Sequence, residues 1–160
     1  METSEHEKRR SEDVTYITQL GSVYRCGVDW ARLQKAPFAD FEPDVVAEYQ
    51  TFFKELNDKG TKIMFVLHHF MNPLWFENNG SWEKEDNIPA FVDYAQKCIQ
   101  HFAEYTYLWN TFNEPNVYAL NGWITGAFPP MKKNYFKGVR VLKNLGKAHD
   151  IVYDLSLIHI

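Results

Sequence analysis

The feature that most constrains the fold is a regular alternation between short apolar segments and longer helical patterns. Three strand-like segments occupy residues 22–30, 62–67 and 107–112, and they favour β-branched and aromatic side chains. The step from one strand to the next covers roughly 40 residues, which leaves room for a helix that crosses back over the sheet. The alternation therefore predicts parallel strands joined by right-handed β–α–β connections.

Apolar residues at helical spacing fill the intervals between these strands. The predicted helices cover residues 7–20, 45–56, 91–102 and 142–152. In the first of them, Val14, Ile17 and Leu20 are expected to point inward. The segments 31–43 and 116–133 follow strands, are punctuated by proline or glycine, and are predicted to be long loops.

Long loops after strands and short ones after helices are typical of a (β/α)₈ barrel whose active site lies at the carboxyl ends of its strands. A doubly wound sheet shows the same alternation but usually carries a glycine-rich phosphate loop, and the sequence has none. We therefore expect an α/β fold that is part of a TIM barrel, covering about strands two to four with their flanking helices.

The segment 107–112 is predicted to be a short buried strand, and it ends abruptly in polar residues. Pro115 has no N–H to donate, so the strand must stop before it. The Asn113 amide and the Glu114 carboxyl are thereby placed at the carboxyl end of the sheet, where parallel α/β proteins carry out their chemistry. Taken alone, Asn-Glu-Pro is also typical of a loop that caps the next turn.

Arg25 lies in the middle of the first strand. A buried arginine is costly unless it is paired, so Arg25 is predicted to face a carboxylate. The alternative is an arginine that extends to one end of the sheet and keeps its guanidinium in water.

The charge and the cysteines exclude several classes of partner. The 160-residue chain has a net charge of −4, which argues against nucleic acid or anionic membrane as a partner. Cys26 and Cys98 match no metal-site spacing, and we expect neither a metal nor a cofactor. Residues 1–13 are highly charged and lack the apolar core of a signal peptide, so a cytoplasmic protein with reduced thiols is predicted, unless a signal precedes this sequence.

Three strand ends carry motifs that together resemble glycoside hydrolase family one, the β-glucosidase family. They are Tyr24–Arg25 with Asp29–Trp30–Ala31–Arg32, Leu67–His68–His69–Phe70 with Pro73 and Trp75, and Thr111–Phe112–Asn113–Glu114–Pro115–Asn116. Two further family segments match at Gly80 and Trp82, and at Gly126, Phe128 and Pro129. The resemblance covers residues 12–154. Asn-Glu-Pro alone is shared by several barrel families, but its combination with the upstream Leu-His-His-Phe is specific.

The resemblance implies retaining hydrolysis of a β-glycosidic bond by two carboxyl groups on opposite sides of that bond. Glu114 matches the acid/base, a role that needs burial among aromatic groups or a nearby carboxylate to keep it protonated. Asn113 matches the residue that binds the sugar 2-hydroxyl, His69 a ligand of the glycone hydroxyls, and Arg25 the arginine beside the nucleophile. His68 is interpreted as a hydrogen-bonded core histidine. Trp82 and Trp109 are interpreted as packing residues.

Some positions depart from the family pattern. Met71 stands where the family usually has Asp, Cys26–Gly27 replaces Phe-Ser, and Asp29 replaces Ser or Glu. These departures lean toward a divergent branch that resembles galactolipid galactosyltransferase. An alternative to hydrolysis of β-glucosides or β-galactosides is therefore glycosyl transfer to a glycolipid. Contact with a membrane is expected only in that case. A non-catalytic carbohydrate-binding fragment is a third.

A complete barrel takes roughly 250 residues. The family's first strand, with its glycone-binding Gln, and its nucleophile strand, with a Thr-Glu-Asn-Gly-like motif, match nothing in this sequence. We therefore expect residues 1–154 to be the N-terminal part of a glycosidase barrel, truncated at both ends and inactive alone. Residues 155–160 (Leu-Ser-Leu-Ile-His-Ile) match the translated end of a transposon-based sequencing adaptor and are predicted to be read-through.

Overall fold

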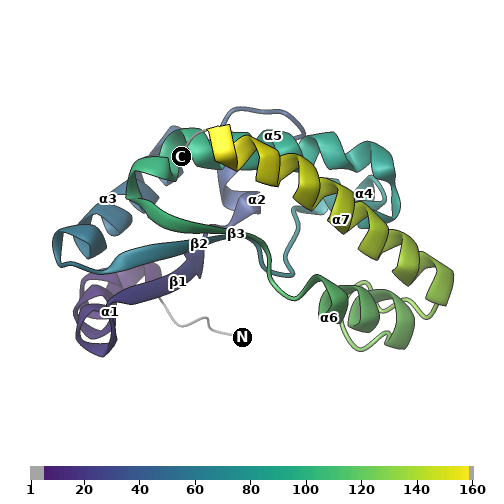
Figure 1. Cartoon of the computed structure of the whole chain (residues 1–160), viewed down its shortest axis with the longest axis horizontal. Coiled ribbons are helices and arrows are strands. Elements are labelled where there is room, and N and C mark those ends of the chain that lie inside the picture. Colours follow the sequence, from purple (N-terminus) through teal and green to yellow (C-terminus); the bar gives the residue numbers. More distant parts are fainter. Residues whose placement is uncertain (1–5, 159–160) are drawn as a thin grey trace.

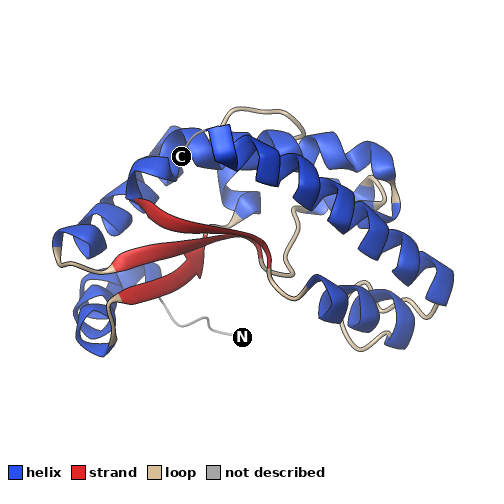
Figure 2. Cartoon of the chain, in the orientation of Figure 1, coloured by secondary structure: helices blue, strands red, loops and turns tan. Residues whose placement is uncertain are grey.

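The structure, a computed structural model, describes residues 6–158. Its centre is a parallel sheet in the order β1 (Val23–Gly27), β2 (Lys62–His68) and β3 (Thr106–Phe112), shown in Figure 2. The register places Arg25 beside Met64, and Met64 beside Leu108. Within the described residues the sheet has two unpaired edges, the outer sides of β1 and β3.

Helices connect the strands and follow the last one. The α-helices are α1 (His6–Leu20), α2 (Trp30–Leu33), α3 (Pro43–Asp58), α4 (Leu74–Asn78), α5 (Ile88–Phe102), α6 (Pro115–Ala119) and α7 (Tyr135–Ile158). Short 3₁₀ turns lie at Ser81–Glu83, Glu85–Asn87 and Ala103–Tyr105, and a π-helical turn covers Leu120–Thr125. No described helix is both long and apolar enough to cross a membrane.

The predicted strands and main helices exist, but two of their bounds are wrong. The first strand ends at Gly27 and not at Trp30, and the last helix runs from Tyr135 to Ile158 and not over 142–152. The prediction that Leu20 points inward is wrong, because this residue is 87% exposed. The predicted loops also contain short helices. Asp29 caps the N-terminus of α2, since its carboxylate accepts hydrogen bonds from the N–H groups of Ala31 and Arg32. Pro115 starts α6, where its missing N–H costs nothing.

Helices α3, α5 and α7 lie together on one side of the sheet (Figure 1). The core between these layers is aromatic. Phe65 of β2 is fully buried, and its ring centroid lies 5.8 Å from that of Phe53 and 5.7 Å from that of Phe102. Further along the sheet, Trp30 stacks on Tyr94 with ring centroids 4.7 Å apart. These rings hold the helices against the strands and so fix where each strand ends.

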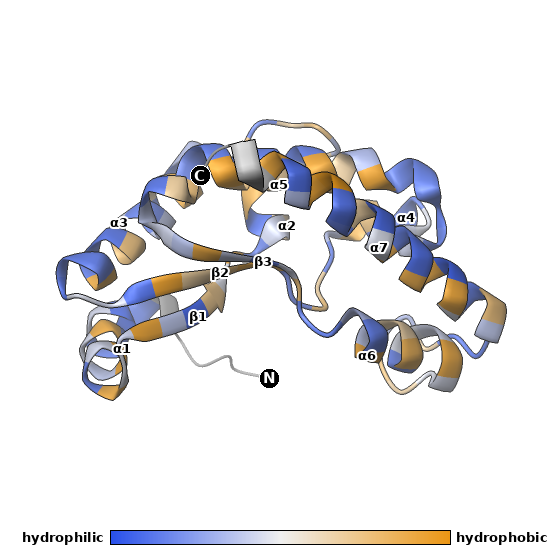
Figure 3. Cartoon of the chain, in the orientation of Figure 1, coloured by the Kyte–Doolittle hydropathy of each residue, from blue (hydrophilic) through white to orange (hydrophobic). Residues whose placement is uncertain are grey.

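The other side of the sheet is exposed at several apolar residues. Figure 3 shows orange apolar segments on β1 and β2, with α1 below one end of β1. Val23 is 49% exposed and Leu108 is 45% exposed. The prediction that the third strand is buried is wrong for this chain, because every residue of β3 is at least partly exposed. The strand has only one neighbour, β2, and so presents an edge to solvent.

Candidate functional site

The predicted site residues meet at the carboxyl ends of the strands. The backbone N–H of Asn113, just after β3, donates to the carbonyl oxygen of His68 at 2.9 Å, so the two strand ends are joined directly. His69 follows at the end of β2 and is exposed. From the open face of β1, the Arg25 guanidinium donates to the Asn113 side-chain oxygen at 2.7 Å. Chain positions 88 residues apart are thereby brought together.

Arg25 differs from the prediction in two respects. Its side chain is exposed, and it donates a hydrogen bond to an amide oxygen, where a carboxylate was predicted. The open face of the sheet explains both, because the guanidinium keeps contact with water and does not need a charged partner. The bond still orients Asn113, since it uses the amide oxygen and turns the NH₂ group of that side chain away from Arg25.

Glu114 has an unusual backbone conformation, with φ 42° and ψ 60°. The left-handed region is uncommon for residues other than glycine and requires support from the surroundings. The support comes from α6, where the N–H of Tyr118 donates to the Glu114 carbonyl at 3.0 Å. The side chain of Glu114 is exposed, so the described residues do not supply the burial that an acid/base role requires.

His69 lines a cavity of about 330 Å³ between the ends of β1 and β2, together with Gly27, Asp29, Met71 and Asn72 among others. A Cβ atom at Gly27 would lie 2.6 Å from the carbonyl oxygen of Val66, so glycine permits the close approach of these two strands. Met71 is 72% exposed at the same strand end. The cavity offers an imidazole and a carboxylate close to the strand ends, which suits a polar, uncharged ligand such as a sugar hydroxyl group.

His68 is a buried core histidine, as predicted. Burial lowers its pKa to about 4, although the hydrogen bond to Asn72 acts in the other direction, so the ring is neutral at pH 7. The packing interpretation of the two tryptophans is also confirmed. Trp82 is fully buried, and Trp109 packs against Phe65 with ring centroids 4.8 Å apart.

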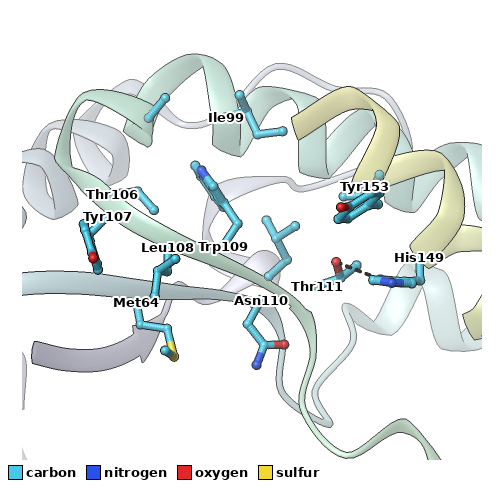
Figure 4. Close-up of a pocket in the computed structure, with 13 residues that line it drawn as sticks. Met64, Ile99, Thr106, Tyr107, Leu108, Trp109, Asn110, Thr111, His149 and Tyr153 are labelled. Atoms are coloured by element: carbon cyan, nitrogen blue, oxygen red, sulfur yellow. Dashed lines mark hydrogen bonds between the residues drawn. The ribbon is translucent and has the colours of Figure 1, made fainter. Parts of the chain in front are cut away.

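A larger cavity, of about 640 Å³, lies along β3 (Figure 4). Trp109 lines it from the strand, Ile99 from α5 and Tyr153 from α7, and Asn110 belongs to its lining as well. The ring of His149 lies 3.1 Å from the hydroxyl oxygen of Thr111. Among the predicted site residues Arg25, His69, Asn113 and Glu114, none lines this cavity.

Comparison with known proteins identifies the family. The family model described as glycosyl hydrolase family 1 matches residues 3–159. This chain belongs to glycosyl hydrolase family 1. It is 32% identical over 149 residues to 6-phospho-beta-galactosidase of Lacticaseibacillus casei, covering 92% of this chain and 31% of that protein. It also superposes on a beta-glycosidase from Pyrococcus horikoshii with a TM-score of 0.88 and 34% identity, covering 94% of this chain and 35% of the other.

The predicted fold is thereby confirmed, since the structural neighbours are family 1 TIM-barrel glycosidases. The chain spans about a third of the length of these relatives. The galactolipid galactosyltransferase of Arabidopsis thaliana chloroplasts also matches, at 24% identity over 143 residues, covering 86% of this chain and 23% of that protein. That likeness is weaker than the likeness to the phospho-galactosidase.

Two features of this family 1 chain were not predicted from its sequence. Asn72 is the centre of a hydrogen-bond network behind the site, and nothing in the pattern around a loop asparagine marks it. Glu83 binds Lys132, Lys137 at 2.8 Å and the Trp123 N–H at 2.9 Å, and so joins the loops that follow β2 and β3. Burial raises the pKa of Glu83, but these hydrogen bonds outweigh burial and lower it to about 2.

The described part of this family 1 chain contains no cluster of three His, Cys, Asp or Glu side chains that could hold a metal ion. Cys26 and Cys98 are both free thiols. Burial raises the pKa of Cys26 to about 12 and raises that of Cys98 as well, so neither is a thiolate at pH 7.

Proposed function

We propose that this chain carries the acid/base half of a retaining β-glycosidase active site. The full-length protein would hydrolyse O-glycosidic bonds of β-glucosides or β-galactosides. The observation that carries this proposal is the arrangement at the strand ends, where the Arg25–Asn113 hydrogen bond fixes Asn113 next to the Glu114 carboxyl. Membership of glycosyl hydrolase family 1 supports it.

In this mechanism Glu114 gives its proton to the glycosidic oxygen as the bond to the anomeric carbon breaks, and a second carboxylate forms a covalent glycosyl-enzyme. Glu114 then takes a proton from water, which attacks the same carbon and releases the sugar. The second carboxylate must stand about 5 Å from Glu114 and belongs to a later strand of the barrel. The chain alone is therefore expected to be inactive.

The other site residues bind and orient the sugar in this proposal. Asn113 holds the 2-hydroxyl group, a contact that strengthens in the transition state. His69 binds the other glycone hydroxyls from the opposite strand end. Arg25, which already orients Asn113, lies beside the nucleophile and helps to keep it ionised.

The domain boundaries and the location remain predictions. We propose residues 1–154 as barrel and 155–160 as adaptor read-through, although α7 continues through Asp154 to Ile158. The predicted cytoplasmic location, the absence of a cofactor and the absence of a nucleic-acid partner complete the proposal.

The experiment is a comparison of leaving groups in the full-length protein. Glu114→Gln keeps the shape of the side chain but removes the transferable proton. The variant should lose about 10²–10⁴-fold in kcat/KM for an alkyl β-glucoside, whose leaving oxygen needs that proton. It should keep most of its activity in the first step with a dinitrophenyl β-glucoside, whose leaving group departs without help. An equal loss with both substrates would refute the assignment of Glu114.

The exposed Met71 supports a second candidate, glycosyl transfer to a glycolipid. An apolar side chain beside the His69 cavity could contact a lipid acceptor, where the family usually has an acidic residue. Incubation of the full-length protein with a galactolipid acceptor and with an aryl glucoside separates the two activities. Rapid hydrolysis without a transfer product would exclude this candidate.

A further inference from the structure

The side chain of Asn72 is fully used in hydrogen bonds. Its oxygen accepts from Trp82 Nε1 at 3.2 Å and lies 3.0 Å from His68 Nε2. Its NH₂ group donates to Glu77 Oε1 at 2.5 Å and to the Tyr118 hydroxyl oxygen at 2.8 Å. An amide oxygen only accepts, so the neutral ring of His68 carries its proton on Nε2. The four bonds leave the amide a single orientation.

Two of these partners also hold the backbone on either side of the candidate catalytic carboxyl. The carbonyl oxygen of His68 accepts from the N–H of Asn113 at 2.9 Å. The N–H of Tyr118 donates to the carbonyl oxygen of Glu114 at 3.0 Å. The Asn113–Glu114 dipeptide is thus held at one end by His68 and at the other by Tyr118, and the side chains of both holders meet at Asn72.

The dipeptide needs such support. Glu114 lies in the left-handed region, which persists for a residue other than glycine only where neighbouring contacts enforce it. Tyr118 is itself fixed by its ring, which stacks on Phe70 with centroids 5.6 Å apart and an interplanar angle of 9°. Loss of the Asn72 amide would leave the buried Trp82 Nε1–H without its acceptor and the Tyr118 hydroxyl oxygen without the donor that binds it, and would free both His68 and Tyr118 to move.

We infer that Asn72 is a positioning residue for proton transfer, because it fixes the direction in which the Glu114 carboxyl points. The inference rests on the proposed role of Glu114. Asn72 lines the His69 cavity, but its side-chain oxygen and NH₂ group are already bonded within the protein, so no proton transfer is assigned to it. It acts through His68 and Tyr118 alone.

The test uses the full-length protein and the same pair of substrates. Asn72→Ala should lower kcat/KM for the alkyl β-glucoside by about 10–100-fold, since a misplacement near 1 Å has that effect on catalysis. For the dinitrophenyl β-glucoside, which needs no proton, the loss should stay below about 3-fold. A purely structural role would reduce the folded fraction and lower both rates by the same factor.

Two further variants keep the test decisive. Tyr118→Phe removes one hydroxyl group and keeps the stacked ring, so it should fold even if Asn72→Ala does not. It should show a smaller selective loss, about 3–10-fold for the alkyl substrate. The matched control is Asn78→Ala, an exposed asparagine at the end of α4, which should change neither rate.

The outcomes separate the inference from the function on which it rests. If Glu114→Gln discriminates between the leaving groups but Asn72→Ala and Tyr118→Phe do not, the inference is overturned and the function stands. If Glu114→Gln itself does not discriminate, the proposed function fails. A loss of activity confined to the alkyl β-glucoside in all three variants, with Asn78→Ala unchanged, supports both the inference and the proposed function.

Discussion

The two faces of the sheet differ in how completely the residues of this chain cover their apolar side chains. On the helix side, Phe65 is enclosed by the rings of Phe53, Phe102 and Trp109, all of which this chain provides. On the open side, Met64 lies between Arg25 and Leu108 in register, and Leu108 is 45% exposed. The helix side is a closely packed core, whereas the described residues leave apolar side chains on the open side exposed to solvent.

In this family 1 chain, the packing that stabilises the fold lies on the helix side, and the proposed catalytic residues lie on the open side and at the strand ends. Local contacts between neighbouring β–α units build the helix side, so the three strands of this chain and their helices already contain it. The residues proposed for catalysis project from the open side and the strand ends, and their remaining partners are expected from later strands. The strand ends bring Arg25, His69 and Asn113 to one edge of the sheet, and a surrounding pocket for substrate is expected from the later strands.

The largest expected effect concerns the chain expressed alone. Its open sheet face and its two unpaired strand edges expose apolar surface and backbone hydrogen-bonding groups, which promote association between copies. We expect an aggregated or molten product without a cooperative thermal transition. Thermal denaturation followed by circular dichroism, together with amide NMR spectra, provides the measurement. Sharp, dispersed resonances with a cooperative transition would show that the open face needs no cover.

A smaller effect is expected from a single substitution on the helix side. Phe65→Ala in the full-length protein should lower the free energy of unfolding by about 3–5 kcal/mol, because it leaves a cavity among three aromatic rings. Tyr16→Ala, at an exposed position on α1, is the control and should change it by less than about 0.5 kcal/mol. Urea denaturation measures both. Similar values for the two variants would mean that the helix side is not a closely packed core.

The smallest effect concerns the loops that extend from the strand ends toward α7. The lowered pKa of Glu83 means that its contribution to stability is complete above the ordinary carboxyl value near 4.5 and is lost as the pH falls toward 2. Because solvent screens part of these ion pairs, Glu83→Gln should cost about 1–2 kcal/mol at pH 7. The difference from wild type should shrink between pH 5 and about pH 2. Parallel stability curves over that range would contradict this assignment.

The sequence predicts the parts of the molecule whose patterns repeat over many residues. Apolar periodicity located the strands and main helices, and the motifs at strand ends placed His69, Asn113 and Glu114 at one edge of the sheet. It could not show that the partner of Arg25 is the Asn113 amide, because that contact joins residues from different β–α units. It also missed Asn72, whose role depends on four partners distant in sequence or spaced without a period.

The most direct test of the central claim is azide rescue of Glu114→Gln in the full-length protein. With a dinitrophenyl β-glucoside, the variant should form the glycosyl-enzyme and then stall, because water has lost its general base. Azide needs no base, so its addition should restore turnover and yield the β-glycosyl azide, with retained configuration. Accumulation of that product would support Glu114 as the acid/base. Unchanged turnover and no glycosyl azide would contradict the account.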